Sequence, residues 1–345
     1  MIKIHNKKID NFKKTFIIAE IGLSHEGSLG LAKYFVDLSA KGGADAVKFQ
    51  MHLPEEESSK HEKFRIKFSS QDDTRYDYWK RTSFTFKEWK ELINHCKKKN
   101  IIFICSPFSI MAVKHLNNLS VPVWKIASGE FNNKFLIKNI SLKSKKPMIL
   151  STGLSDLKEI KDVVKYLKKL KAKFCLLQCT SEYPTDISRV GHSLIKKFRN
   201  QFKVPIGISD HSGNLNSAIA GISMGAAIIE IHVVLEKNYF GPDSSSSITF
   251  DELKIVSTFN KDFNKIKNSN IKKINSKKIS NMKYLFNKSL TASKDIKKGS
   301  RIKMADLKDT KPNIGIPASN FEKILGKKVR KNIKKGSFLN LKHFN

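Results

Sequence analysis

The chain has 345 residues, of which 40% are hydrophobic, and its formal net charge is +34. This length suffices for one large core and a small second domain. No apolar run approaches the roughly 20 residues of a membrane-spanning helix, and the N-terminus lacks the apolar core of a signal peptide, so we expect a cytoplasmic protein without a membrane partner. The lysines are spread along surface-helix patterns without interleaved aromatic residues, which argues against nucleic acid as a partner.

Short apolar runs alternate with helical patterns along the first three quarters of the chain. This alternation predicts βα units on a parallel sheet, and eight such units fit a closed (β/α)8 TIM barrel. The runs are almost continuously apolar, as expected for strands buried on both faces. The predicted strands are 16–20, 46–50, 101–105, 123–127, 148–151, 174–179, 205–209 and 227–232.

Helix signals lie between the predicted strands. Thr85 with Glu88 and Thr249 with Glu252 form capping-box patterns, which open helices after the second and the eighth strand. The segment 55–80 is charged and lacks clear periodicity. It predicts a long loop after the second strand, on the face where barrel enzymes hold their sites.

The last quarter of the chain has a different character. Residues 266–283 are rich in Lys, Asn and Ser and predict a linker between a barrel domain, 1–265, and a small β-rich domain, 284–345. The sequence of residues 295–300 is echoed by residues 332–337, each with a glycine suited to a turn, which predicts a duplicated hairpin. A domain of this size is marginal alone, so we expect it to dock on another surface.

Polar side chains stand at the C-terminal ends of nearly all the predicted strands, where barrel enzymes carry their catalytic groups. Lys48 and Lys125 lie within apolar strands, and burying either lysine unpaired would cost several kcal/mol. They therefore predict a bound anion or a buried carboxylate partner such as Glu20.

Two histidines, His211 and His232, close the last two predicted strands. Adjacent strand ends place two imidazoles about 5 Å apart, which suits a divalent metal that takes further ligands from water or substrate. An anion site, a metal and Glu20 together indicate carbonyl chemistry, in which the metal acts as a Lewis acid on an aldehyde oxygen.

Nine short motifs follow one another through the barrel. They are Ala19-Glu-Ile-Gly22 with His25-Glu-Gly27, Val47-Lys-Phe-Gln50, Ser106-Pro-Phe-Ser109, Lys125-Ile-Ala-Ser-Gly-Glu130, Leu150-Ser-Thr-Gly153, Cys179-Thr180, Tyr183-Pro184, Gly207-Ile-Ser-Asp-His211 and Gly241-Pro-Asp243. Their order and spacing resemble the sialic acid synthase family, and the tail resembles the family's C-terminal antifreeze-like (SAF) domain. The resemblance covers almost the whole chain.

The resemblance implies a reaction and its site residues. The family condenses phosphoenolpyruvate with an N-acetylmannosamine-like amino sugar, giving a nonulosonic acid and phosphate. It uses a divalent cation, most often Mn2+ with Mg2+ or Co2+ as alternatives, on the residues that match His211 and His232. Phosphoenolpyruvate contacts would fall on Lys48, Ser106, Lys125, Ser128, Ser151 and Ser209, and sugar contacts on Gln50, Glu130, Tyr183 and Asp243.

The same resemblance implies a domain-swapped homodimer, in which Lys311 of the tail faces the sugar in the partner's barrel. Glu20 would be the acid/base group: the enol carbon attacks the open-chain aldehyde, water adds to the resulting cationic centre, and phosphate leaves. Glu20 either stabilises this cation or activates the water, and the sequence leaves the two roles open.

The chain departs from the family at three places that bear on the sugar. Ser181-Glu182 replaces a usual asparagine, Ile231 stands where a basic residue is common, and Lys311 replaces an arginine, which loses a bidentate fork. The acceptor therefore stays open between an N-acetylmannosamine-like sugar and a di-acylated, deoxygenated one, as used for legionaminic or pseudaminic acid.

Two other functions account for parts of the sequence. A different phosphoenolpyruvate-dependent aldol-type synthase would act on another sugar, but the antifreeze-like tail and Gly241-Pro-Asp243 argue against it. A non-catalytic polyanion-binding protein would not need Glu20, His211 and His232 at strand ends.

Overall fold

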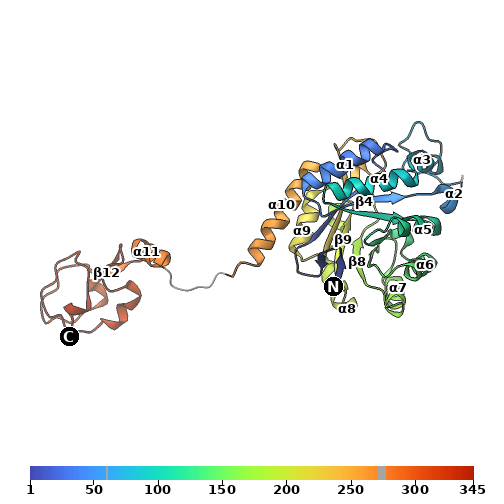
Figure 1. Ribbon diagram of the computed structural model, residues 1–345. Helices are drawn as coiled ribbons and strands as arrows, with labels where there is room; N and C mark the ends of the chain where they lie inside the picture. The colour runs from blue at the N-terminus through green and yellow to red at the C-terminus, as the bar shows by residue number, and fades with distance from the viewer. Residues whose placement is uncertain (60, 271–276) are drawn as a thin grey trace. The chain divides into compact units, whose positions relative to one another are not determined.

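The computed structural model describes residues 1–59, 61–270 and 277–345. The chain forms two compact units, Met1–Ser269 and Asn270–Asn345, which we describe separately (Figure 1). Within the described ranges, no helix has both the length and the apolar character needed to cross a membrane.

The first unit is built on eight parallel strands, as predicted for a TIM barrel. The hydrogen-bonded order is β5-β4-β3-β10-β9-β8-β7-β6, and β5 lies against β6, which nearly closes the barrel. A ninth strand, β11 (Ile248–Thr249), extends the pairing of β10. The barrel strands are β3 (Phe16–Gly22), β4 (Ala46–Met51), β5 (Ile102–Pro107), β6 (Trp124–Ile126), β7 (Met148–Ser151), β8 (Phe174–Cys179), β9 (Ile206–Asp210) and β10 (Ile228–Val234).

Helices surround the barrel and bury its outer face (Figure 1). Both predicted capping boxes are present: Thr85 caps α4 with Glu88, and Thr249 caps α10 with Glu252. These reciprocal bonds satisfy backbone donors that a helix N-terminus leaves free. The helices are α1 (Leu29–Gly42), α4 (Phe86–Lys98), α5 (Ile110–Asn118), α6 (Lys134–Lys143), α7 (Leu157–Lys169), α8 (Ser193–Phe202), α9 (Leu215–Ser223) and α10 (Phe250–Lys267).

A short hairpin closes the N-terminal end of the barrel. Its strands β1 (Ile2–Ile4) and β2 (Lys7–Ile9) pair antiparallel, and Ile2, Ile4 and Ile9 pack among the apolar side chains inside the barrel. The sequence analysis did not predict this hairpin. The N-terminal end of the barrel is thus filled with apolar side chains. The polar part of the barrel interior lies at the C-terminal ends of the strands.

The segment 55–80 contains more structure than the predicted loop. It overlaps helices α2 (Pro54–Glu57) and α3 (Arg75–Thr82), and residues 61–74 run between these helices as a loop. Part of the predicted linker is also helical, because α10 continues to Lys267 and α11 occupies Lys277–Phe286. The predicted linker thus contains helical residues at both of its ends, and its residues 271–276 lie outside the described part of the chain.

The second unit has its own small core around β12 (Ser289–Ala292) and β13 (Leu307–Thr310), which pair antiparallel. The sequence predicted a hairpin in each of the two repeated segments. In the structure the two segments pair with each other instead. Ile296 and Ile333 exchange both backbone hydrogen bonds, at 2.8 and 2.9 Å. The Asp295 carboxylate accepts from the backbone N–H of Lys335 in the second repeat. The Asn332 amide oxygen accepts from the backbone N–H of Lys298 in the first repeat, so the pair has approximate two-fold symmetry.

Candidate active site

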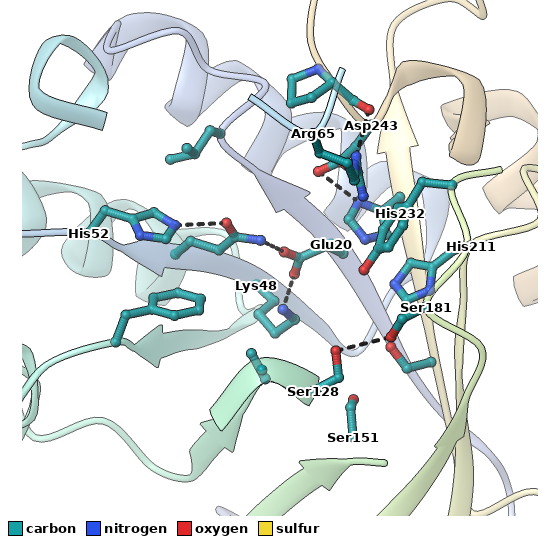
Figure 2. A pocket seen from close by; sticks show the side chains of 18 of the residues that line it. Glu20, Lys48, His52, Arg65, Ser128, Ser151, Ser181, His211, His232 and Asp243 are labelled. Carbon is teal, nitrogen blue, oxygen red and sulfur yellow. Dashed lines mark hydrogen bonds and ion pairs between the residues drawn. The ribbon is translucent and has the colours of Figure 1, made fainter. Parts of the chain in front are cut away.

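A cavity of about 440 Å³ opens at the C-terminal ends of the barrel strands (Figure 2). This volume lies within the roughly 300–1,000 Å³ that is common for ligand pockets. The barrel brings together most of the predicted site residues, although they are far apart in sequence. Those that line the cavity are Glu20, Lys48, Gln50, Lys125, Ser128, Ser151, Tyr183, Ser209, His211, His232 and Asp243.

Two lysines and two carboxylates form a buried charge cluster at the floor of the cavity. Lys48 Nζ lies 2.6 Å from Glu20 Oε2 and 3.8 Å from Glu230 Oε1. Lys125 Nζ lies 3.5 Å from the same oxygen of Glu230. The predicted partner of Lys48 is thus correct, whereas Glu230, which the sequence analysis did not select, is shared by both lysines.

The cluster gives its two carboxylates different acidities. Burial and the nearby charge of Glu230 raise the pKa of Glu20 to about 7, although Lys48 counteracts them. Burial also acts to raise the pKa of Glu230, but Lys125 and Lys48 outweigh it and hold that pKa below its ordinary value. Glu230 therefore stays ionised at neutral pH, while Glu20 is able to hold or release a proton.

Several hydroxyl groups lie in the cavity with the two lysines. Lys125 Nζ donates to Ser151 Oγ at 2.8 Å, and Ser209 Oγ donates to Glu230 Oε1 at 3.0 Å. Ser128 Oγ accepts from Ser181 Oγ at 3.2 Å. These donors face one small region of the cavity, so the arrangement can hold a compact anion through charge-assisted hydrogen bonds.

The two histidines meet as predicted from their strands. The ring centroids of His211 and His232 are 5.2 Å apart. Burial lowers the pKa of His211 to about 4 and also lowers that of His232, so both rings are neutral at pH 7, the form that binds metals. His211 Nδ1 lies 3.0 Å from the Thr180 carbonyl and donates to it, which leaves Nε2 as a free lone pair.

These features fit a divalent cation held by two imidazoles. The Asp243 carboxylate lies beside this position, 3.9 Å from His232 Nδ1. Among the described residues, no cluster of three or more His, Cys, Asp or Glu side chains is arranged around a common point. A metal at this position would therefore take its remaining ligands from water or substrate.

Arg65 closes one side of the cavity and was not predicted. Its Nη2 donates to Asp243 Oδ1 at 2.8 Å and to the Pro242 carbonyl at 2.9 Å. The guanidinium lies 3.8 Å above the ring of Tyr183, which in turn packs 4.2 Å from His211. An arginine in a charged, aperiodic segment resembles a solvated residue, so this role was not predictable from the sequence.

Aromatic side chains from the segment after β4 form an apolar wall that the sequence analysis also missed. Their clustering within a charged segment was the signal that could have identified them. The wall consists of these aromatic side chains and their apolar neighbours: Leu23, Phe64, Ile66, Phe68, Tyr78, Trp79 and Phe108.

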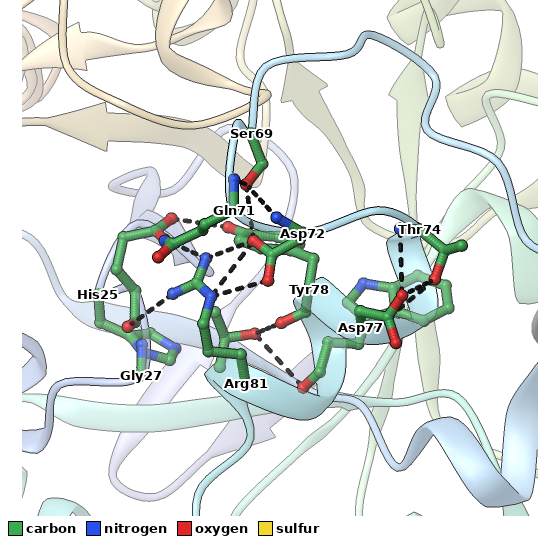
Figure 3. Close-up of polar contacts among 12 residues, drawn as sticks. His25, Gly27, Ser69, Gln71, Asp72, Thr74, Asp77, Tyr78 and Arg81 are labelled. Atoms are coloured by element: carbon green, nitrogen blue, oxygen red, sulfur yellow. Dashed lines mark hydrogen bonds and ion pairs between the residues drawn. The ribbon is translucent and has the colours of Figure 1, made fainter.

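An ion-pair network fastens this segment to the barrel (Figure 3). Arg81 Nε and Nη2 donate to the two oxygens of Asp72 at 2.9 and 2.8 Å, and Nη2 also donates to Glu26 at 2.9 Å. Tyr78 donates to Glu26 at 2.8 Å. The loop between α2 and α3 is thus tied to the segment that follows β3, on which Glu20 lies.

Two predicted residues of the first unit do not line the cavity. Ser106 is fully buried, and its hydroxyl has no hydrogen-bond partner. Glu130 ends a short 3-10 helix (Ser128–Glu130) and accepts from Asn133 at 2.7 Å. Lys311 belongs to the second unit, where its Nζ lies 5.3 Å from the ring centroid of Phe286.

Solved structures with the same fold identify the class of protein. N-acetylneuraminic acid (sialic acid) synthetase from Leptospira borgpetersenii aligns with a TM-score of 0.70 at 30% identity, covering 82% of this chain and 95% of that one. Over most of its length the chain is therefore similar to a sugar-acid synthase. The chain belongs to the NeuB family, whose family model matches residues 35–272, and a SAF domain matches residues 287–345.

Curated relatives extend over nearly the whole chain. N,N'-diacetyllegionaminic acid synthase of Campylobacter jejuni is 37% identical, covering 95% of this chain and 99% of that protein. Pseudaminic acid synthase of the same species is 32% identical, covering 96% and 98%. The expected family and the expected enzyme class are thereby confirmed.

Proposed function

We propose that the protein condenses phosphoenolpyruvate with an N-acylated amino sugar, giving a nonulosonic acid and phosphate. The observation that carries this proposal is the convergence of two lysines, the Glu20 carboxyl group and two neutral histidines on one cavity. An anion-binding floor, a proton-handling group and a candidate metal position are the parts that this condensation needs.

Phosphoenolpyruvate fits the floor of the cavity. Lys48 and Lys125 supply positive charge, and Ser128, Ser151 and Ser209 supply hydroxyl donors for carboxylate and phosphate oxygens. A bound anion would engage the lysine that now pairs with Glu20. Because less positive charge would then act on the carboxylate, substrate binding would raise the Glu20 pKa further.

The chemistry assigned to Glu20 follows from its acidity and its place. The enol carbon of phosphoenolpyruvate forms a bond to the aldehyde carbon of the open-chain sugar, and the aldehyde oxygen becomes a hydroxyl by taking a proton. Water then adds to the cationic carbon and loses a proton, and phosphate leaves as the carbon–oxygen bond breaks. A carboxyl group with a pKa of about 7 is suited to these proton transfers.

We also propose that the enzyme uses a divalent cation, Mn2+ foremost with Mg2+ or Co2+ as alternatives. His211 and His232 would hold it, because both rings are neutral and neighbouring. When bound, such a cation supplies Lewis-acid polarisation of a carbonyl oxygen. Tyr183 and Arg65 pack beside this position and would orient the sugar against it.

The sugar that fits best is di-acylated and deoxygenated. The apolar wall of Phe64, Ile66, Phe68, Trp79 and Phe108 would contact a methyl group and a second acyl group. A sugar with more hydroxyl groups would leave them without partners against this wall, which disfavours its binding. The relationship to synthases of diacetyllegionaminic and pseudaminic acid supports the same choice.

Two broader expectations belong to the same proposal. We place the enzyme in the cytoplasm, where its four cysteines, all free and buried, would stay reduced. We further propose a homodimer in which the tail of one subunit, with Lys311, completes the site of the other.

The test is a substrate panel with phosphate release as the readout. Phosphoenolpyruvate would be combined in turn with a 2,4-diacetamido-2,4,6-trideoxy sugar, N-acetylmannosamine and a phosphorylated aldose, and products would be identified by mass spectrometry. We expect release with the first sugar to exceed the others. Release only with the phosphorylated aldose would favour the other aldol-type synthase, and no release with any sugar would favour a binding protein.

A further inference from the structure

A row of hydrogen bonds leads from Glu57 of α2 to the Glu20 carboxylate, and Figure 2 shows its part from His52 to Glu20. Glu57 Oε1 lies 2.7 Å from His52 Nδ1, and His52 Nε2 lies 3.1 Å from Gln50 Oε1. Gln50 Nε2 donates to Glu20 Oε1 at 3.0 Å, while the other oxygen of Glu20 lies 2.6 Å from Lys48 Nζ. Gln50 and Lys48, both on β4, thus contact different oxygens of Glu20.

The imidazole of His52 is held in a fixed plane. It stacks between Trp79, with centroids 4.4 Å apart and planes at 9°, and Phe108, with centroids 4.2 Å apart and planes at 16°. The residue is 5% exposed. Because both faces are covered, the ring nitrogens are confined to the directions of Glu57 and Gln50.

The donor pattern of the row depends on His52. With a proton on Nε2, the ring donates to the Gln50 amide oxygen, and this turns the Gln50 amide nitrogen toward Glu20. Nδ1 then either donates to the Glu57 carboxylate as part of a charged ring or, in a neutral ring, accepts from a carboxyl O–H of Glu57. If Nε2 lacked that proton, the amide would reverse to donate to the ring. Its oxygen would then face an oxygen of Glu20 at hydrogen-bond distance, where an ionised carboxylate is repelled.

We propose that His52 is a positioning residue for the reaction: held by Glu57, it sets the orientation of the Gln50 amide and thereby holds the Glu20 carboxylate. This inference rests on the function proposed above for Glu20. Gln50 and Lys48 hold one oxygen each, so the carboxylate plane is fixed before substrate binds. Loss of the Gln50 anchor would leave Lys48 as the main restraint on its rotation.

The central variant is His52→Phe, which keeps an aromatic ring between Trp79 and Phe108 but removes both nitrogens. We expect kcat to fall about 10- to 100-fold, the range for a displaced catalytic group, with the KM for phosphoenolpyruvate changed by less than about threefold. His52→Gln retains an amide donor near the Nε2 position and should recover most of the loss. His115→Phe, on α5, is the matched control and should behave as wild type.

A double-mutant cycle separates positioning from a general effect on folding. If His52 acts through Gln50, His52→Phe introduced into Gln50→Leu should lower kcat by no more than about twofold further. Independent, multiplicative losses would overturn the proposal, as would a His52→Phe enzyme within twofold of wild type. Thermal unfolding checks each variant, and Glu57→Leu, expected to lower kcat in the same direction, replaces His52→Phe if that variant does not fold.

A spectroscopic measurement makes the test independent of turnover. Long-range 1H–15N spectra of histidine-labelled wild-type protein, with the His52 signal assigned by its absence in His52→Phe, show which ring nitrogens carry protons. We expect a protonated Nε2, and an unprotonated Nε2 would overturn the inferred orientation. If wild-type protein shows the Nε2 proton but is inactive on every sugar, the proposed function is wrong and the inferred orientation is not.

Discussion

At the scale of single residues, the surroundings of two glutamates give their carboxyl groups different pKa values. Glu20 and Glu230 are buried carboxylates on neighbouring strands, β3 and β10. Glu230 lies near both lysines and remains charged, whereas Glu20 has one lysine and a like charge nearby. Separated acidities of this kind mark acid/base groups in many enzymes.

Replacement of Glu20 tests that assignment. We expect Glu20→Gln to lower kcat by about 10²–10⁴-fold, the range for a positioned acid/base group, with little change in the KM for phosphoenolpyruvate. Steady-state phosphate release measures both constants. A variant within a few-fold of wild type would show that Glu20 serves only as a partner of Lys48.

The raised pKa of Glu20 also predicts a pH-dependent stability. Its value is 4.5 for an ordinary carboxyl group and about 7 in the folded chain, so between these pH values folding takes up a proton. The folded state is therefore destabilised as pH rises through this window. We would measure the free energy of unfolding of wild-type and Glu20→Gln protein by denaturant titration without metal. The difference, Glu20→Gln minus wild type, should become more positive from about pH 5 to about pH 7.5. A difference that does not change with pH would contradict the raised pKa.

Metal removal tests the pair of histidines. We expect a chelator to abolish turnover and Mn2+ to restore it, because a cation on the two histidines would supply the Lewis acid that polarises the aldehyde oxygen. His211→Ala and His232→Ala should each lose turnover and Mn2+ binding by calorimetry, while His115→Ala should lose neither. Full turnover in excess chelator would refute the metal assignment.

At the scale of elements, the parts of the fold that depend on strand burial were predictable. Parallel strands that are covered on both faces are apolar along most of their length, so they can be recognised in the sequence. Barrel geometry then places residues such as Lys48, Ser151 and His211 at the C-terminal ends of the strands. Arg65 and His52 were not predictable, because the course of the chain after β4 is fixed by contacts distant in sequence. The β1–β2 hairpin was missed because its strands are only three residues long.

The ion-pair network around Arg81 makes the loop between α2 and α3 a testable element. Arg81→Lys would lose the paired bonds to Asp72, and the loop that carries Arg65 would be held less firmly. We expect the KM for the sugar to rise about tenfold, with the KM for phosphoenolpyruvate nearly unchanged. Limited proteolysis within residues 61–74 should also become faster.

Lys80→Ala is the control for this prediction, since Lys80 lies on the same helix with an exposed side chain. It should leave both KM values and the cleavage rate unchanged. Equal increases of both KM values in Arg81→Lys would mean that the network supports the whole site rather than its sugar side.

At the scale of the whole molecule, the second unit carries features of a domain that binds elsewhere. Its own core is small. Helix α11 also presents large apolar side chains that are exposed, including Met282, Leu285 and Phe286. Because exposed apolar patches often mark interaction surfaces, we expect this one to be covered when the tail binds a barrel.

Mixing two inactive variants tests whether the tail acts on a partner subunit. One variant carries Glu20→Gln, and the other lacks residues 284–345 or, if that chain does not fold, carries Lys311→Glu. A mixed dimer would contain one barrel with an intact Glu20 that receives an intact tail from the other subunit. We therefore expect activity to reappear on mixing, up to about a quarter of the wild-type value if subunits exchange at random and only that barrel works. Native mass spectrometry would establish that mixed dimers form, and their inactivity would show that each tail serves its own barrel or none.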